Sequence, residues 1–326
     1  MLTYIVRRLL HALLVTVLVS IIVFTLIRML PGDPVEMLYA ENALAEMTKE
    51  DIEEIRHELW LDRPIIIQYL RWVGQVITGD FGHSIMRGFD IGSQILSRMS
   101  VTVTIGFSAF IVGLIVGPLL GIISAIRRGK FIDNLVSVIA NIGMTAPQFW
   151  VAILLVFVFG LKLKWLPTFG YTPPLQDLGK SINECILPVF VSSLGSIAAT
   201  ARQMRSSALE TLGEDYIRTA WAKGMNERKV IFRHMLKNSL IPVITLQGSM
   251  LRSIFGGSVI VETIFVIPGM GKMMVDGLLS QDYPVIQATA LIMTIIVVMS
   301  TLIVDLAYGW VDPRIQYSSR RDLMWN

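Results

Sequence analysis

The sequence predicts an all-α integral membrane protein with six transmembrane helices. Of its 326 residues, 53% are hydrophobic and 16% are charged, which is too apolar for an ordinary soluble domain. Several apolar runs reach about 20 residues, the length that an α-helix needs to cross the hydrocarbon core of a bilayer. The single cysteine, Cys185, excludes an intrachain disulfide framework and argues against a metal cluster or a thiol-based enzyme.

Six apolar runs are the expected spans. The first follows Arg7 and Arg8 and is too long for the apolar region of a signal peptide, so we expect it to remain as a membrane helix. The spans are expected at residues 9–27, 101–126, 135–161, 187–201, 240–261 and 284–310.

Two of these spans carry further signals. Gly113, Gly117 and Gly121 recur every four residues in the second span, a spacing that lets a neighbouring helix approach closely. Pro147 lies inside the third span, where the missing backbone N–H predicts a kink in a helix that otherwise continues.

The distribution of Lys and Arg predicts which side of the membrane each loop occupies. The loops on the side of both termini hold 16 Lys or Arg residues, whereas the short loops on the opposite side hold four (Lys162, Lys164, Lys180 and Lys272). Because basic loops stay in the cytoplasm, we expect both termini and the basic segment 202–238 to be cytoplasmic.

These expectations divide the chain into an N-terminal segment with the first span, a helical extracytoplasmic insertion, a core of five spans and a tail. The insertion is polar and should contain one helix near 48–59 and another at 64–77, with Ile66, Tyr69 or Leu70, Val73 and Ile77 on one face of the second. The expected boundaries are 1–30, 31–100, 101–310 with the cytoplasmic loop 202–238, and 311–326.

The basic segment 202–236 is the part of the chain around which the rest is organised. Leu209, Leu212, Tyr216, Ala220 and Lys223 follow helical steps, and a second apolar stripe follows the interruption at Gly224. Two short amphipathic helices joined at a glycine indicate a docking element for another protein. The alternative is a pair of interfacial helices attracted to anionic lipid.

Several catalytic motifs are absent from the sequence. It has no G-x-x-x-x-G-K-[ST] loop for ATP phosphates, no H-E-x-x-H and no G-x-S-x-G. A chain with six spans, a basic docking loop and no energy site of its own is expected to be driven by a partner.

Motifs spread over nearly the whole chain resemble the bacterial ABC importer permeases, and within them the first-permease (B-type) branch of the dipeptide/oligopeptide/nickel family. The central one is DYIRTAWAKG at 215–224, which resembles the cytoplasmic EAA loop of these permeases. The others include LPGDP at 30–34, GDFGHS at 79–84, VETIF at 261–265, PGMG at 268–271, DYPVIQ at 282–287 and VDPR at 311–314.

The resemblance implies a type I importer fold and a non-catalytic transmembrane subunit that moves short peptides into the cytoplasm by alternating access. It implies two six-span permease subunits in the bacterial inner membrane, two cytoplasmic ATPases that bind ATP and Mg, and an external substrate-binding protein. The chain itself would need no cofactor and no metal, and it would not bind nucleic acid.

The resemblance also implies which residues couple the spans to the ATPases. Arg218 departs from the family pattern, which has a Glu there, so a salt bridge from that Glu is not available; Lys237 and Trp221 depart as well. The expected coupling residues are Glu214, Tyr216, Arg218, Ala220, Gly224, Arg228 and Leu236.

Polar residues inside the spans are candidates for the translocation pathway. Asn141, Thr145 and Gln148 form one polar stripe of the third span. Arg252 lies near the middle of the fifth span, where an ionised Arg costs roughly 2.5–3.5 kcal/mol or more. It would either face the aqueous pathway and meet a carboxylate of the cargo or pair with the second permease.

Alternative functions remain open at the level of sequence. The same architecture could import nickel chelates, glutathione or oligosaccharides. A protein of another class, either a secondary transporter that needs no ATPase or a membrane enzyme, would be expected to carry intramembrane acidic residues, and these spans have few.

Overall fold

The computed structural model is helical throughout its regular structure, apart from one isolated antiparallel bridge between His83 and Asp90, in the part of the chain that it describes. Most of the predicted helix near 48–59 and the tail 312–326 lie outside this part. The described residues are 2–29, 53, 56–57 and 60–311.

The chain forms two compact units. Unit 1 comprises Val103–Ile267 and the chain from Ser300, and unit 2 comprises Leu2–Thr102 and Pro268–Met299. Helices α5 (Ile91–Ile126) and α13 (Tyr283–Val311) contribute residues to both.

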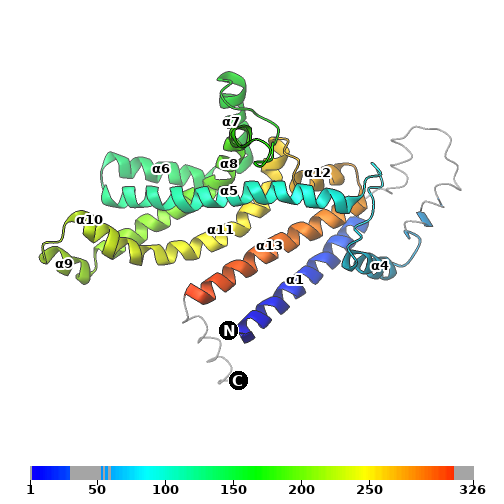
Figure 1. Cartoon of the computed structure of the whole chain (residues 1–326), viewed down its shortest axis with the longest axis horizontal. Coiled ribbons are helices and arrows are strands. Elements are labelled where there is room, and N and C mark those ends of the chain that lie inside the picture. The colour runs from blue at the N-terminus through cyan, green and yellow to red at the C-terminus, as the bar shows by residue number, and fades with distance from the viewer. Residues whose placement is uncertain (1, 30–52, 54–55, 58–59, 312–326) are drawn as a thin grey trace. The chain divides into compact units, whose positions relative to one another are not determined.

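Unit 1 is built around α8 (Leu178–Leu212), which packs against α6 (Phe131–Thr145) and α11 (Leu236–Ile264) (Figure 1). The contacting surface of α8 consists mainly of small residues, which allow helix backbones to approach closely in a membrane. They include the buried Ser196, Ala198, Thr200, Ala201 and Ala208.

The glycines of α5 lie against α8. A Cβ atom at Gly121 would be 2.5 Å from the carbonyl oxygen of Ala201, and one at Gly117 would be 2.7 Å from the Cβ of Thr200. No side chain fits at these positions unless α8 shifts. The close approach predicted from the four-residue spacing is therefore confirmed.

The third span is not the kinked but continuous helix that the sequence predicts. It consists of α6 and of α7 (Gln148–Leu155), which is extended by a π-helix at Val156–Lys162, and the two arms are bent by 110°. Pro147 lacks a backbone N–H and disfavours a helical conformation in the preceding residue, and Ala146 is extended with ψ 129°. Two consecutive non-helical residues break the span.

In unit 2, α1 (Leu2–Arg28) packs against α4 (Ile65–Ile77), the helix predicted at 64–77. The Oγ of Ser20 lies 2.8 Å from the hydroxyl oxygen of Tyr69, and the Arg28 Nε donates to Gln68 Oε1 at 2.8 Å. The apolar face of α4 is exposed, since its buried residue is Gln68.

The other end of unit 2 joins two motifs that are far apart in the sequence. The buried carboxylate of Asp282 accepts a hydrogen bond from the Ser84 hydroxyl and others from the backbone N–H groups of Ile85 and Met86. Asp282 lies between α12 (Met270–Leu279) and α13. The 79–84 segment is thereby attached to the start of α13.

Five helices of the described chain are long and apolar enough to cross a membrane, and the bent pair α6–α7 is a sixth candidate if it counts as one span. The predicted number of six spans is thus met only with a broken third member.

Candidate functional site

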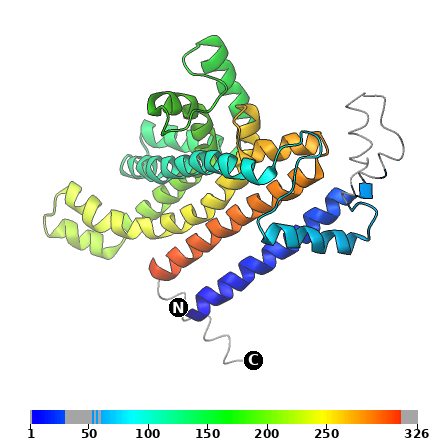
Figure 2. The same cartoon turned by 45° about the vertical axis from the view of Figure 1, so that its right-hand side comes forward.

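The basic loop folds as a helical hairpin at the end of α8 and α11. Helix α9 (Asp215–Ala222) is followed by α10 (Glu227–Val230), a π-helix at Ile231–Met235 and then, without a break, by α11 (Figure 2). We call residues 213–230 the α9–α10 hairpin. Since α8 also reaches Leu212, the hairpin is joined directly to two long helices, one at each end.

The prediction of a first amphipathic helix is wrong, because no single helix carries Leu209, Leu212, Tyr216 and Ala220. Helix α8 ends at Leu212, Gly213 caps it, and Glu214 is extended with ψ 147° before α9 begins. Glycine has a low helix propensity, so the chain bends there instead of continuing. Leu209 and Leu212 consequently belong to α8 and pack in the core between α8 and α11.

Gly224 shapes the turn of the hairpin. Its φ of +73° is a conformation that glycine adopts easily and other residues rarely. The Gly224 N–H donates to the Trp221 carbonyl oxygen at 2.9 Å, and the Met225 N–H donates to the Ala220 carbonyl oxygen at 3.3 Å. This pair of bonds is a Schellman motif, which satisfies the last carbonyls of α9. The expected bend at Gly224 is present, as the C-terminal cap of α9.

The next helix starts with its own cap, because the Asn226 side chain accepts a hydrogen bond from the Lys229 N–H at 3.0 Å. Between the two caps, Ile217, Ala220 and Val230 form a small buried cluster against Leu212 and Met225. Ile217 is fully buried, although it was not among the residues predicted from the sequence. Its spacing of three residues from Ala220 was the available signal.

Polar bonds fix the base of the hairpin to the long helices. The Ser239 hydroxyl of α11 lies 3.0 Å from the Thr211 hydroxyl of α8, and both are buried. The Asn238 Nδ2 donates to the Tyr216 hydroxyl at 2.8 Å. A displacement of α9 would therefore be passed to α8 and α11.

The hairpin and the π-helix that follows it expose basic and aromatic side chains. Trp221 and Phe232 are exposed although neither was predicted as a contact residue. Glu214, Tyr216, Arg218 and Arg228 are exposed, whereas Ala220 is buried and Leu236 is half-buried. Of the predicted coupling residues, Ala220 and Leu236 thus support the hairpin from inside, and the others are accessible.

A second basic feature lies where α5 ends and α6 begins. The Arg205 guanidinium of α8 binds the Asp133 carboxylate at two points, Nε to Oδ1 at 2.7 Å and Nη2 to Oδ2 at 2.9 Å. Asp133 also accepts from the Ser124 hydroxyl and from the Gly129 N–H. This buried carboxylate ties the α5–α6 turn to α8.

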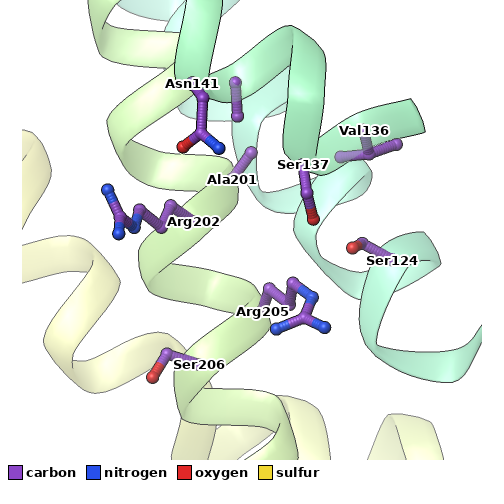
Figure 3. Close-up of a pocket in the computed structure, with 9 residues that line it drawn as sticks. Ser124, Val136, Ser137, Asn141, Ala201, Arg202, Arg205 and Ser206 are labelled. Carbon is purple, nitrogen blue, oxygen red and sulfur yellow. The ribbon is translucent and has the colours of Figure 1, made fainter. Parts of the chain in front are cut away.

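An open pocket of about 280 Å³ adjoins this ion pair (Figure 3). Figure 3 shows the Asn141 carboxamide and the Arg202 guanidinium on the same side of α8, whereas Arg205 turns toward Ser124. The Arg202 guanidinium approaches only the Met144 sulfur, at 4.0 Å, among the described side chains. The pocket is lined by Ser124, Val136, Ser137, Ala140, Asn141, Ala201, Arg202, Arg205 and Ser206.

The other predicted pathway residues are spread along unit 1. The Gln148 carboxamide lies beside α11, where a Cβ at Gly257 would be 3.0 Å from its Oε1. Thr145 donates to the Asn141 carbonyl oxygen of its own helix at 2.9 Å. Arg252 is exposed on α11, and no ion pair joins it to another residue among those that the structure describes.

Sequence reasoning also missed a buried polar group in the same helix. Gln247 of α11 is almost fully buried and donates from Nε2 to the Thr200 hydroxyl at 2.9 Å. Its Oε1 accepts from Ser196 at 3.3 Å. Hydrogen bonds of this kind hold membrane helices together, so Gln247 joins α11 to α8.

The sequence is similar to bacterial peptide permeases. It is 38% identical over 319 residues to a peptide permease protein of Brucella suis, covering 97% of this chain and 99% of that protein. It is also 38% identical over 320 residues to the oligopeptide transport system permease protein AppB of Bacillus subtilis, covering 97% and 100%.

The fold is similar to a solved transporter. The structure matches the crystal structure of an amino acid ABC transporter with a TM-score of 0.50 at 14% identity, covering 66% of this chain and 92% of that one.

Two family descriptions together account for almost the whole sequence. Residues 1–105 match the N-terminal part of the membrane component of binding-protein-dependent transport systems. Residues 117–317 match the main part, which contains the α9–α10 hairpin, the Asp133–Arg205 pair and the adjoining pocket. The chain therefore belongs to the family of inner membrane components of binding-protein-dependent transport systems.

Proposed function

We propose that this chain is the transmembrane subunit of an ATP-driven importer that moves short peptides from an external binding protein to the cytoplasm. The observation that carries the proposal is the α9–α10 hairpin, an accessible basic surface that follows α8 after a bend at Gly213–Glu214 and continues without a break into α11. A partner that moves this surface would move both helices. That is the arrangement needed to convert a conformational change of an ATPase into a change of access across the membrane.

Peptides are the proposed cargo because the relatives that match over their full length are named as peptide and oligopeptide permeases. The chain is proposed to have no catalytic activity of its own. ATP and Mg would be bound by the partner ATPases.

The proposed assembly contains a second homologous permease subunit, two ATPases and one binding protein. Both termini and the α9–α10 hairpin are proposed to face the cytoplasm, because the loops on that side carry most of the Lys and Arg residues. Glu214, Tyr216, Arg218 and Arg228 would contact the ATPases, since they are the exposed members of the predicted coupling set.

The pathway is proposed to run along the polar side of α6. Asn141 and Thr145 of α6 would line it, together with Gln148 at the start of α7 beyond the 110° bend, and Arg252 of α11 would be exposed to the same aqueous space. Charged side chains within spans face a bundle interior or a water-filled cavity, because lipid cannot solvate them.

Uptake by the complete transporter tests this function. The chain, co-expressed with its partner subunits, is purified and reconstituted into liposomes with the binding protein and enclosed ATP. We expect accumulation of a labelled short peptide that depends on ATP and on the binding protein. Purification of the chain without an ATPase, or uptake that does not require ATP, would contradict the proposal.

The turn at Gly224 provides a test of coupling. In Gly224→Val a β-branched residue must adopt a left-handed conformation, which costs roughly 1–2 kcal/mol and distorts the C-terminal cap of α9. We expect this variant to assemble but to hydrolyse more ATP per peptide transported, by about 3-fold or more.

Gly224→Asn is the matched control, because Asn tolerates the left-handed region and no atom lies within 4 Å of the added Cβ. It should keep a ratio of hydrolysis to transport near that of the unaltered protein. Equal ratios in the Val and Asn variants would show that the turn plays no part in coupling.

A further inference from the structure

The pocket beside the Asp133–Arg205 pair carries a net positive charge that comes from one residue. Arg205 is neutralised by the two-point contact with Asp133. Arg202 has no anionic partner among the described residues, and its closest polar contact is the sulfur of Met144. The pocket is therefore suited to an anion, and Arg202 is the group that would attract it.

Hydrogen-bond donors without a side-chain partner line the same pocket. The side chains of Ser137, Asn141 and Ser206 line the pocket and bond to no other side chain in the described part of the structure. These donors are accessible to a ligand, since Asn141 and Ser206 are exposed and Ser137 is half-buried. Two hydroxyls, a carboxamide and a guanidinium together match the oxygens of a carboxylate, which accept several hydrogen bonds.

The pocket lies on the polar side of α6. Asn134, Ser137, Asn141 and Thr145 follow one another at steps of three and four residues, so they form one stripe of the helix that passes through the pocket. The other exposed positions of α6, including Leu135, Ile139 and Ile142, are apolar and suit lipid. A stripe of amides and hydroxyls is instead expected to face water in the transport pathway.

The size of the pocket limits what it can hold. Its volume of about 280 Å³ is just below the range of about 300–1,000 Å³ that is usual for pockets that hold drug-sized ligands. It would accommodate the end of a chain molecule and not a whole oligopeptide.

We propose that this pocket, at the cytoplasmic end of the spans, is a binding site for the C-terminal carboxylate of the peptide as it leaves the pathway, with Arg202 as the main contact. The proposal rests on the proposed function, since it names the part of the cargo that the site would recognise. Asn141 and Ser137 of α6 and Ser206 of α8 would donate hydrogen bonds to the carboxylate. Arg205 would not bind it, because its guanidinium is already paired with Asp133.

The test compares two peptides in one assay. The complete transporter, reconstituted with its partner subunits, is given an equal mixture of a dipeptide and its C-terminal amide at concentrations that saturate the binding protein. The quantity measured is the ratio of acid to amide taken up. The binding protein is the same for every variant, so a change in this ratio between variants comes from the permease.

We expect Arg202→Gln to lower the acid-to-amide ratio by roughly tenfold, since hydrogen bonds to charged groups are worth about a factor of ten or more. Arg202→Lys should retain most of the preference because the charge remains. Arg128→Gln is the matched control: it removes one cation from the exposed α5–α6 turn, outside the pocket, and should leave the ratio unchanged.

Each outcome decides between the explanations. An unchanged ratio in Arg202→Gln overturns the carboxylate site while uptake of both peptides still supports the proposed function. Failure of the unaltered transporter to take up either peptide contradicts the proposed function itself. Should Arg202→Gln fail to assemble, Asn141→Ala and Ser206→Ala each remove one donor and should lower the ratio by about 2- to 5-fold.

Repeating the assay in liposomes with and without anionic lipid tests whether a lipid headgroup occupies the pocket in place of the peptide carboxylate. If Arg202→Gln alters the response to anionic lipid and leaves the acid-to-amide ratio unchanged, the pocket binds lipid phosphate and the proposal is wrong.

Discussion

Two buried aspartates, one in each unit, hold loops to helices by different means. Asp133 and Asp282 each expose 2% of their surface. Asp133 is bound by the Arg205 guanidinium, a hydroxyl and one N–H group, whereas Asp282 is bound by the Ser84 hydroxyl and two N–H groups. The first contact pairs two opposite charges, and the second pairs a charge with neutral donors.

This difference determines how each site responds to substitution. Removal of one member of a buried ion pair leaves the other charge without compensation, which is far more costly than an unmet neutral hydrogen bond. A neutral donor, in contrast, can bond equally well to an amide oxygen. The loss of stability should therefore differ most between the two sites for two kinds of substitution. One removes the partner of the aspartate, and the other replaces the aspartate by Asn and so removes only its charge.

The largest effect is expected for Arg205→Met. It leaves the Asp133 carboxylate buried with only the Ser124 and Gly129 donors, and breaking such a pair costs about 3–5 kcal/mol. Thermal unfolding of the purified complex, followed by tryptophan fluorescence, measures the loss.

The double variant Asp133→Asn/Arg205→Met is the control for this loss. Because it removes both charges together, it should be clearly more stable than Arg205→Met alone. A double variant as unstable as the single one would show that Arg205 acts by packing and not through its charge.

An intermediate effect is expected for Asp282→Ala. The Ser84 hydroxyl and the N–H groups of Ile85 and Met86 lose their acceptor, and buried unsatisfied donors cost about 1–3 kcal/mol. The unfolding midpoint of the complex should fall, and the 79–84 segment should become more accessible to protease.

Asp276→Ala is the matched control in the same unit. Asp276 pairs with Lys272 four residues earlier on a partly exposed surface of α12, and such pairs are worth about 0.2–1 kcal/mol. If Asp276→Ala destabilises the protein as much as Asp282→Ala, burial of Asp282 is not what makes it important.

The sequence predicted the helical elements better than the contacts that hold them. Apolar runs and the glycine spacing located the spans and the α5–α8 packing, because both depend on local periodicity. The Asp133–Arg205 pair joins residues 72 positions apart, so no periodicity indicates it. Asp282 was recognised only as part of a motif, and its bond to Ser84 spans 198 positions.

The structure contains two helix breaks that the sequence did not predict, and each has a local physical cause. At the first break, Pro147 predicts only a kink, but the extended Ala146 before it ends α6. At the second, the apolar stripe from Leu209 to Ala220 predicts a continuous helix, but α8 ends at Leu212 and α9 begins at Asp215. In each case the apolar periodicity extends over residues that do not favour a helical backbone, so periodicity alone predicted a continuous helix. The pocket around Arg202 could not be predicted at all, since it depends on how α5, α6 and α8 come together.

The smallest effect is expected for Asp282→Asn, and it separates the two sites most sharply. The carboxamide that this substitution introduces keeps its oxygen for the Ser84 hydroxyl and the Met86 N–H, and its NH₂ group meets only the Ile85 N–H. Because the bond from Ile85 is already long, at 3.3 Å, the cost should be about 1 kcal/mol or less. At the other site, Asp133→Asn places an N–H₂ group against the Arg205 guanidinium, where two donors face each other.

The same isosteric change should therefore lower the unfolding midpoint more at 133 than at 282. Equal midpoints in the two Asn variants would show that the partners' charge is irrelevant, and that burial alone sets the cost of altering either aspartate.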